Sequence, residues 1–187
     1  MESKNIIILF SGNGSNLENI YKKMHGKIFG DFKIQIPLAI SNNARAYGIT
    51  RCKDLNLNYV VLENKNFDFE LINILKNEKI DLVVLAGFMR ILGEEFCKSY
   101  KTINIHPSIL PLFKGANALR ESFESYMKIA GVSVHFVNEI LDSGELIAQD
   151  IIQKINGENF EDFKQRIHAL EHRIYPKAIL EVLNCKI

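Results

Sequence analysis

Two short segments of this chain are apolar on both faces, and they limit the folds it can adopt. Asn5–Phe10 (NIIILF) and Asp81–Gly87 (DLVVLAG) lack the polar alternation of a strand that has one side in water. Such strands are buried on both faces, which is typical of parallel sheets covered by helices. The remaining segments must therefore supply helices for two faces of a sheet.

Strand-length and helix-length segments alternate through the first two thirds of the chain. Further strands are predicted at Lys33–Ile40, Tyr59–Leu62 and Thr102–Ile105. Helices are predicted from Asn16 to Met24, at Ala46–Leu55 and at Phe67–Asn77. This alternation predicts an α/β fold with an open, mostly parallel, doubly wound Rossmann-like sheet.

The last third of the chain has a different pattern. Val132–Val137 alternates like an antiparallel or edge strand, and Leu146–Ile155 like its partner. Apolar residues then recur at helical spacing from Phe160 to Ile179, and Pro176 is expected to kink or break this helix. We expect an antiparallel C-terminal extension, a long C-terminal helix and a single domain over residues 1–187.

Composition excludes several classes of protein. The 23 basic and 22 acidic residues give a net charge of +1, so neither nucleic acid nor a membrane surface is an expected partner. The three cysteines are far apart and no HExxH occurs, so we expect no metal. The early apolar run Ile6–Phe10 is too short for a signal peptide or a membrane span, which predicts a cytoplasmic protein.

A glycine-containing loop follows the first strand. In open α/β sheets ligands bind beyond the carboxyl ends of the strands, where Ser11–Asn16 (SGNGSN, the glycine loop) is predicted to lie. Glycines and free N–H groups at a helix start suit a phosphate. The alternative is a simple helix start, with Ser15 and Glu18 as a capping box. Leu17 replaces the third glycine of a dinucleotide fingerprint and no Walker lysine follows, so a monophosphate ester fits best.

Asn104 and His106 end another predicted strand. Residues two apart share a face, so the amide and the imidazole can donate hydrogen bonds to one developing oxyanion. Pro107 holds His106 near extended geometry, and imidazole can move a proton near neutral pH. The alternative is a structural histidine at a strand end.

Two acidic residues are further candidates. Asp142 lies in a Leu-Asp-Ser-Gly turn, where it is either an ordinary turn residue or a carboxylate that orients His106. Glu171 lies at the margin of the apolar face of the long helix, where a solvated side chain is the default. His135 and His172 are more typical of structural histidines.

These motifs, taken together, resemble the phosphoribosylglycinamide formyltransferases, a folate-dependent family of purine synthesis. The resemblance covers nearly the whole chain. The matching segments are Ser11–Asn16, Leu85–Leu92 (LAGFMRIL), Asn104–Pro111 (NIHPSILP), Ser133–Val137, Leu141–Asp142 and Glu171–Pro176. The resemblance implies formyl transfer from 10-formyltetrahydrofolate, as a cosubstrate, to the amine of 5-phosphoribosylglycinamide. It also implies a formyltransferase-type sheet and a monomer or homodimer whose partners are these small molecules.

The resemblance also implies roles for individual residues. Asn104, His106 and Asp142 would be catalytic. Gly14, Ser15, Asn16 and Glu171 would bind the phosphoribosyl substrate. Met89, Arg90, Ile91 and Leu92 would line the folate pocket, together with Asn104, Asp142 and the segment 138–142.

Two regions depart from the family pattern. Asn117 and Leu119 stand where the family often has histidines, and Glu63–Phe69 is shortened, with Lys65 as a candidate for the missing basic contact to the folate tail. The alternatives are formyltetrahydrofolate deformylase, a sugar-amine formyltransferase or a catalytically silent nucleotide-binding module. Methionyl-tRNA formyltransferase would need a further domain and a basic surface.

Overall fold

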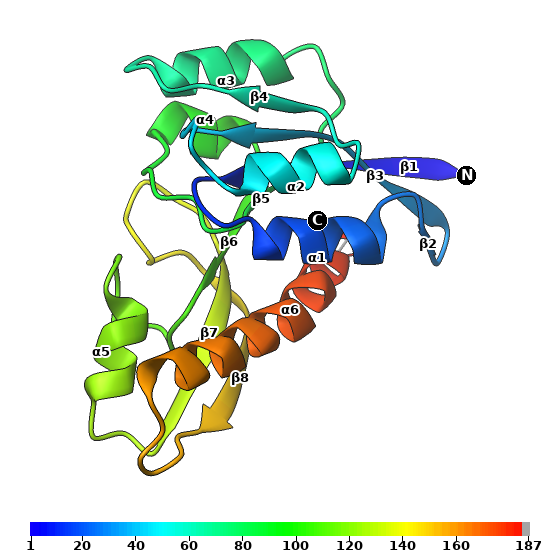
Figure 1. The fold of residues 1–187 in the computed structure, drawn as a ribbon. Helices are drawn as coiled ribbons and strands as arrows, with labels where there is room; N and C mark the ends of the chain where they lie inside the picture. Colours follow the sequence, from blue (N-terminus) through cyan, green and yellow to red (C-terminus); the bar gives the residue numbers. More distant parts are fainter. Residues whose placement is uncertain (185–187) are drawn as a thin grey trace.

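The computed structural model describes residues 1–184, which form one continuous sheet with helices on both faces (Figure 1). The strands are β1 (Glu2–Phe10), β2 (Ile28–Phe29), β3 (Phe32–Ser41), β4 (Tyr59–Val61), β5 (Leu82–Leu85), β6 (Thr102–His106), β7 (Ile129–Phe136) and β8 (Leu146–Gln153). The helices are α1 (Ser15–Met24), α2 (Gly48–Asp54), α3 (Phe67–Leu75), α4 (Glu94–Ser99), α5 (Ala118–Glu124) and α6 (Phe160–Asn184). The predicted α/β class is confirmed. The short elements β2, α4 and α5 were not predicted, because they span too few residues to show a period.

The sheet runs in the order β2-β3-β1-β5-β6-β7-β8, and β4 also pairs with β3. The pairs of β1 with β3 and β5, of β3 with β4 and of β5 with β6 are parallel. The β6–β7 and β7–β8 pairs are antiparallel, as the alternation in the last third predicted. The chain order reverses between β1 and β5, so the loops that follow these two strands meet at a switch point, where open α/β sheets bind ligands.

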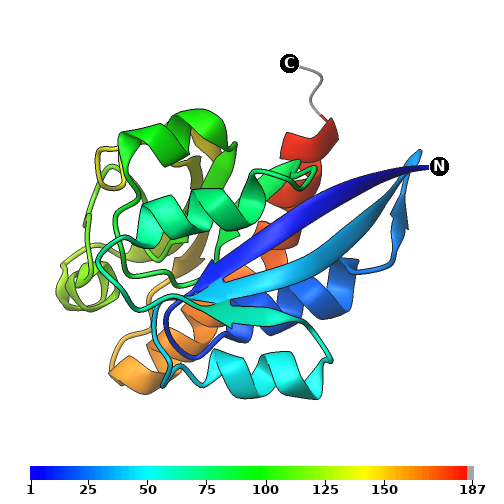
Figure 2. The same ribbon diagram turned by 90° about the horizontal axis from the view of Figure 1, so that it is seen from above.

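Two apolar clusters cover the two faces of the sheet. Alternate residues of β1 belong to different clusters: Ile6 and Ile8 pack with α1 and α6, whereas Ile7 and Leu9 pack with α3 and α4. Figure 2 shows α1 and α6 on one side of the sheet and α3 on the other. The strands are therefore apolar on both faces because helices cover both faces of the sheet, as predicted from the sequence.

The long C-terminal helix is continuous through Pro176. The predicted break at this residue is therefore wrong. Proline leaves the carbonyl four residues earlier without its helical partner. That carbonyl, of His172, instead accepts hydrogen bonds from the Asn19 amide at 3.0 Å and the Lys23 ammonium at 2.9 Å, both on α1. The proline thus makes an acceptor that joins α6 to α1.

A buried tyrosine fixes α6 against the sheet. The Tyr175 hydroxyl lies 2.7 Å from the Leu85 carbonyl, to which it donates, and 3.2 Å from the Ile103 carbonyl. Complete burial raises the pKa of Tyr175 well above its ordinary value, so the hydroxyl keeps its proton. The ends of β5 and β6, which carry the candidate site, are therefore tied to the helix that carries Glu171.

Candidate active site

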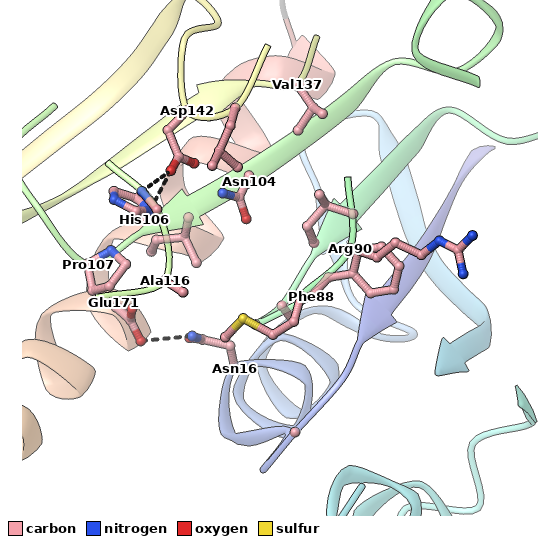
Figure 3. A pocket seen from close by; sticks show the side chains of 18 of the residues that line it. Asn16, Phe88, Arg90, Asn104, His106, Pro107, Ala116, Val137, Asp142 and Glu171 are labelled. Atoms are coloured by element: carbon pink, nitrogen blue, oxygen red, sulfur yellow. Dashed lines mark hydrogen bonds and ion pairs between the residues drawn. The ribbon is translucent and has the colours of Figure 1, made fainter. Parts of the chain in front are cut away.

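A cavity of about 500 Å³ opens at the carboxyl ends of β1, β5 and β6. All residues singled out in the sequence as site residues line this cavity: Gly14, Ser15, Asn16, Met89, Arg90, Ile91, Leu92, Asn104, His106, Asp142 and Glu171. They come from segments far apart in the chain, and Figure 3 shows several of them facing one another across the cavity.

The glycine loop forms one end of the cavity. Gly14 is the residue before the first turn of α1, with φ of 75°, a conformation that favours glycine. The alternative interpretation, a capping box of Ser15 and Glu18, is wrong, because Ser15 lies within the first turn and no side chain caps the helix. Glu18 instead pairs with Lys22 and Arg51. The loop therefore presents backbone N–H groups to the cavity rather than a side-chain cap.

Glu171 is buried at the same end, with 5% of its surface exposed. Its carboxylate accepts a hydrogen bond from the Asn16 amide at 2.9 Å, and the His168 ring nitrogen Nδ1 lies 2.9 Å from the same oxygen (Figure 3 draws the first). The default expectation of a solvated Glu171 is therefore wrong. The sequence reading missed His168, although its i, i+3 spacing from Glu171 was a usable signal.

His106 and Asp142 lie together at the centre of the cavity (Figure 3). His106 Nδ1 lies 3.5 Å from Asp142 Oδ2, and its Nε2 lies 2.8 Å from the Phe113 carbonyl, to which it donates. Asp142 Oδ2 also accepts the Gly115 N–H at 2.8 Å. Asp142 has φ of 48° and is buried, so it is not a turn residue that faces solvent.

A second histidine completes this group. His135 lies opposite Asn104 in the β6–β7 ladder, and its Nε2 is 3.3 Å from the Asn104 amide nitrogen and 3.6 Å from Asp142 Oδ1. Its Nδ1 lies 2.8 Å from the Phe136 carbonyl. The sequence favoured a structural role for His135, and only the pairing of two strands reveals how close it is to the site.

The pKa of Asp142 is lowered overall. Burial by itself raises it, but hydrogen bonds from His135 and from the Gly115 N–H, with the nearby His106 imidazole, outweigh burial. Asp142 is consequently a carboxylate throughout the neutral range. An anion beside two imidazoles can fix their ring orientation.

The opposite end of the cavity is apolar and open. Met89 and Ile91 are 74% and 61% exposed, and Ile140 and Leu141, which line the same cavity, are 62% and 50% exposed. The Met89 N–H donates to the Ser11 hydroxyl at 2.8 Å, which connects this end to the glycine loop. Unpaired apolar side chains around a cavity fit a flat, largely apolar ligand.

Arg90 is already engaged within the chain. Its guanidinium donates to the carbonyls of Asn64 and Lys65 at 3.1 and 3.2 Å and lies over the Phe67 ring. The Lys65 side chain does not line the cavity. In the loop that departs from the family pattern, Leu119 lines the cavity and Asn117 precedes α5 without a side-chain cap.

Neither a metal site nor a membrane helix is found in residues 1–184. No three His, Cys, Asp or Glu side chains there are grouped to hold a metal ion. No helix within the same residues is long and apolar enough to span a bilayer. Cys185 lies outside the described residues.

Comparison with known proteins agrees with this geometry. A model of the family described as formyl transferase matches residues 4–179. A phosphoribosylglycinamide formyltransferase of Bacillus subtilis is 35% identical over 97% of this chain and 95% of its own length. The human trifunctional purine biosynthetic protein adenosine-3 is 34% identical over 93% of this chain, which spans only 18% of that protein.

A solved structure extends the comparison to the fold. The crystal structure of phosphoribosylglycinamide formyltransferase from Campylobacter jejuni has a TM-score of 0.93 and 48% sequence identity. The match covers 97% of this chain and 98% of that one.

Proposed function

This chain belongs to the formyl transferase family, and within it to the phosphoribosylglycinamide formyltransferases, which act in purine biosynthesis. We propose that the cavity at the strand ends is where it transfers the formyl group to phosphoribosylglycinamide. The proposed formyl donor is 10-formyltetrahydrofolate. The observation that carries the proposal is the convergence of Asn104, His106 and Asp142 in one cavity with the glycine loop and several exposed apolar side chains.

The proposed reaction is direct transfer. The substrate amine bonds to the formyl carbon, the formyl oxygen becomes an oxyanion, and the bond from that carbon to the folate nitrogen then breaks. A proton leaves the amine and reaches the folate nitrogen through Asp142 and water. His106 and Asn104 donate hydrogen bonds to the oxyanion, and no bond to the protein is needed.

The surroundings of His106 support this role and add a requirement. Its Nε2–H already donates to a carbonyl oxygen, that of Phe113, at 2.8 Å. An oxyanion can replace this acceptor at the same nitrogen once the Phe113 carbonyl has moved away. The carboxylate of Asp142, 3.5 Å from the other ring nitrogen, holds the ring so that Nε2 can point at the oxyanion.

The two substrates occupy opposite ends of the cavity in this proposal. The glycine loop, through Gly14, Ser15 and Asn16, holds the phosphate, and Glu171 faces the glycinamide part. The exposed apolar side chains of Met89 and Ile91, with Leu92 and the backbone of Arg90, cover the folate ring. The segment 138–142 closes over it from the other side.

A transfer assay tests the proposal. Purified protein with 10-formyltetrahydrofolate should form tetrahydrofolate only when phosphoribosylglycinamide is present, and the product should carry the formyl group. Release of free formate without an amine would identify a deformylase instead. Transfer to an amino sugar, with none to phosphoribosylglycinamide, would identify a sugar-amine enzyme, and no turnover at all would leave a silent binding module.

A further inference from the structure

Arg51 of α2 contacts the glycine loop from the side away from the cavity. Its Nε donates to the Asn13 carbonyl at 2.9 Å, and its Nη2 donates to the Asn13 side-chain oxygen at 3.1 Å. Its Nη1 pairs with Glu18 in the first turns of α1. Arg51 is not among the residues that line the cavity. Its effect on a ligand must therefore pass through the loop.

The neighbouring peptide of the loop is held by the same helix. The Gly48 N–H donates to the Gly12 carbonyl at 3.0 Å. The backbones of Gly14 and Gly48 touch, because a Cβ on Gly14 would lie 2.6 Å from the Gly48 Cα. Three consecutive loop residues, 12 to 14, are thus in contact with α2.

These contacts determine where the N–H groups of the loop point. In a trans peptide the carbonyl and the following N–H point in opposite directions. With the Gly12 and Asn13 carbonyls directed at α2, the N–H groups of Asn13 and Gly14 are directed away from it. Within residues 1–184 neither N–H has a hydrogen-bond partner, and both residues line the cavity. They are therefore available to an anion.

Arg51 also acts on the charge of the loop. Glu18 lies in the first turn of α1, where its carboxylate would repel a bound phosphate. The Arg51 guanidinium, together with Lys22, neutralises that carboxylate. The same side chain thus orients one peptide and cancels one unfavourable charge.

We infer that Arg51 is a positioning residue for the substrate phosphate: it turns the Asn13–Gly14 peptide so that its N–H faces the ligand, and it neutralises Glu18. The inference rests on the proposed function, since it assumes that the glycine loop binds a phosphate. It assigns Arg51 no contact with substrate and no part in the chemical step.

Kinetics of Arg51→Ala test the inference. Loss of hydrogen bonds from a charged donor should raise the KM for phosphoribosylglycinamide by about tenfold or more. The kcat and the KM for 10-formyltetrahydrofolate should change less than about twofold, because the centre and the apolar end are untouched. Arg51→Lys keeps the charge near Glu18 but cannot make the forked contact to Asn13. Its KM for phosphoribosylglycinamide should therefore lie between those of the wild type and Arg51→Ala. Arg45→Ala is the matched control, because Arg45 is an exposed arginine outside the cavity.

A dephosphorylated substrate separates this inference from the proposed function. For the wild type, calorimetry should show far weaker binding of ribosylglycinamide than of phosphoribosylglycinamide. Equal binding of both would overturn the phosphate assignment of the loop itself. Given a large difference in the wild type, Arg51→Ala should reduce the ratio of the two affinities about tenfold while leaving ribosylglycinamide binding unchanged.

Two results would overturn the role of Arg51 while leaving the loop assignment intact. One is unchanged affinity of Arg51→Ala for both ligands. The other is an equal loss of affinity for both ligands, which indicates general loosening of the fold. If Arg51→Ala does not fold, Arg51→Lys decides the case, provided that its melting temperature equals that of the wild type. A wild-type KM for phosphoribosylglycinamide in Arg51→Lys would then contradict the need for the forked contact to Asn13.

Discussion

The two ends of the cavity are built on opposite principles. At the glycine-loop end, polar side chains are buried and held by one another, as in the pair of Asn16 with Glu171, while the N–H groups of Asn13 and Gly14 have no partner within residues 1–184. At the other end, Met89 and Ile140 are apolar and mostly exposed. One end holds its donors in fixed positions before a ligand binds, whereas the other leaves its apolar surface in water.

The difference follows from what each end has to recognise. A phosphate loses its hydration on binding, so its donors must be held in place beforehand. An apolar ring needs only contact area, and exposed side chains gain that area when the ring covers them. Substitutions at the two ends should consequently affect different substrates and by different amounts.

The largest effect is expected where the two ends meet. His106→Ala should lower kcat roughly a hundredfold or more, the usual scale for an oxyanion donor or general acid. Both substrates should bind with wild-type affinity in calorimetry, since their contacts lie at the two ends. His25→Ala, which removes a histidine outside the cavity, should retain wild-type kcat. A His106→Ala variant with near wild-type turnover would remove this imidazole from the chemistry.

At the glycine-loop end, Gly14→Ala should raise the KM for phosphoribosylglycinamide by roughly thirtyfold. Positive φ costs about 1 kcal/mol for a residue with a side chain, and displacement of the loop from Gly48 adds to it. Gly26→Ala is the control, because Gly26 has a φ of 72°, close to the 75° of Gly14, but open space around it. Equal kinetic effects from both alanines would argue against a rigid loop end.

Asp142→Asn should lower kcat roughly tenfold at neutral pH, because the amide keeps the shape of the side chain but can neither accept a proton nor hold the His106 ring as an anion does. Burial raises the pKa of Asp142, but hydrogen bonds from His135 and the Gly115 N–H outweigh it and hold the pKa below its ordinary value, so the wild-type side chain is ionised throughout the neutral range. The ratio of wild-type to variant kcat, measured over a pH series, should therefore be constant through the neutral range and shrink only in acid, where the wild-type carboxylate takes up its proton. Equal kcat of the two proteins at neutral pH would contradict this role.

The smallest effect is expected at the apolar end. Met89→Ala removes an exposed side chain that only a bound ring would cover, so the KM for the folate should rise about threefold to tenfold. The KM for phosphoribosylglycinamide and the kcat should not change. Ile155→Ala removes a similarly exposed apolar side chain outside the cavity and should have no kinetic effect. A larger kinetic effect from Met89→Ala than from Gly14→Ala would contradict the expected order of the two ends of the cavity.

The layered α/β fold follows from local sequence patterns alone. Apolar residues on both faces of Asn5–Phe10 and Asp81–Gly87 require helices on both sides, whatever the details of packing. The sequence also indicated where the site lies, because the ends of parallel strands meet at one edge. The Asn104–His106 spacing was sufficient to place both side chains in the cavity.

Other properties depended on contacts between segments that are distant in the chain. The burial of Glu171 against Asn16, the approach of His135 to Asp142 and the fork of Arg51 on Asn13 each join residues from different elements. Pro176 is another example. Its helix is continuous, and the His172 carbonyl that proline leaves without a helical partner accepts hydrogen bonds from α1, a distant part of the chain. Local sequence encodes periodicity and turn preference, whereas the partner of a buried polar group is decided by which elements pack together.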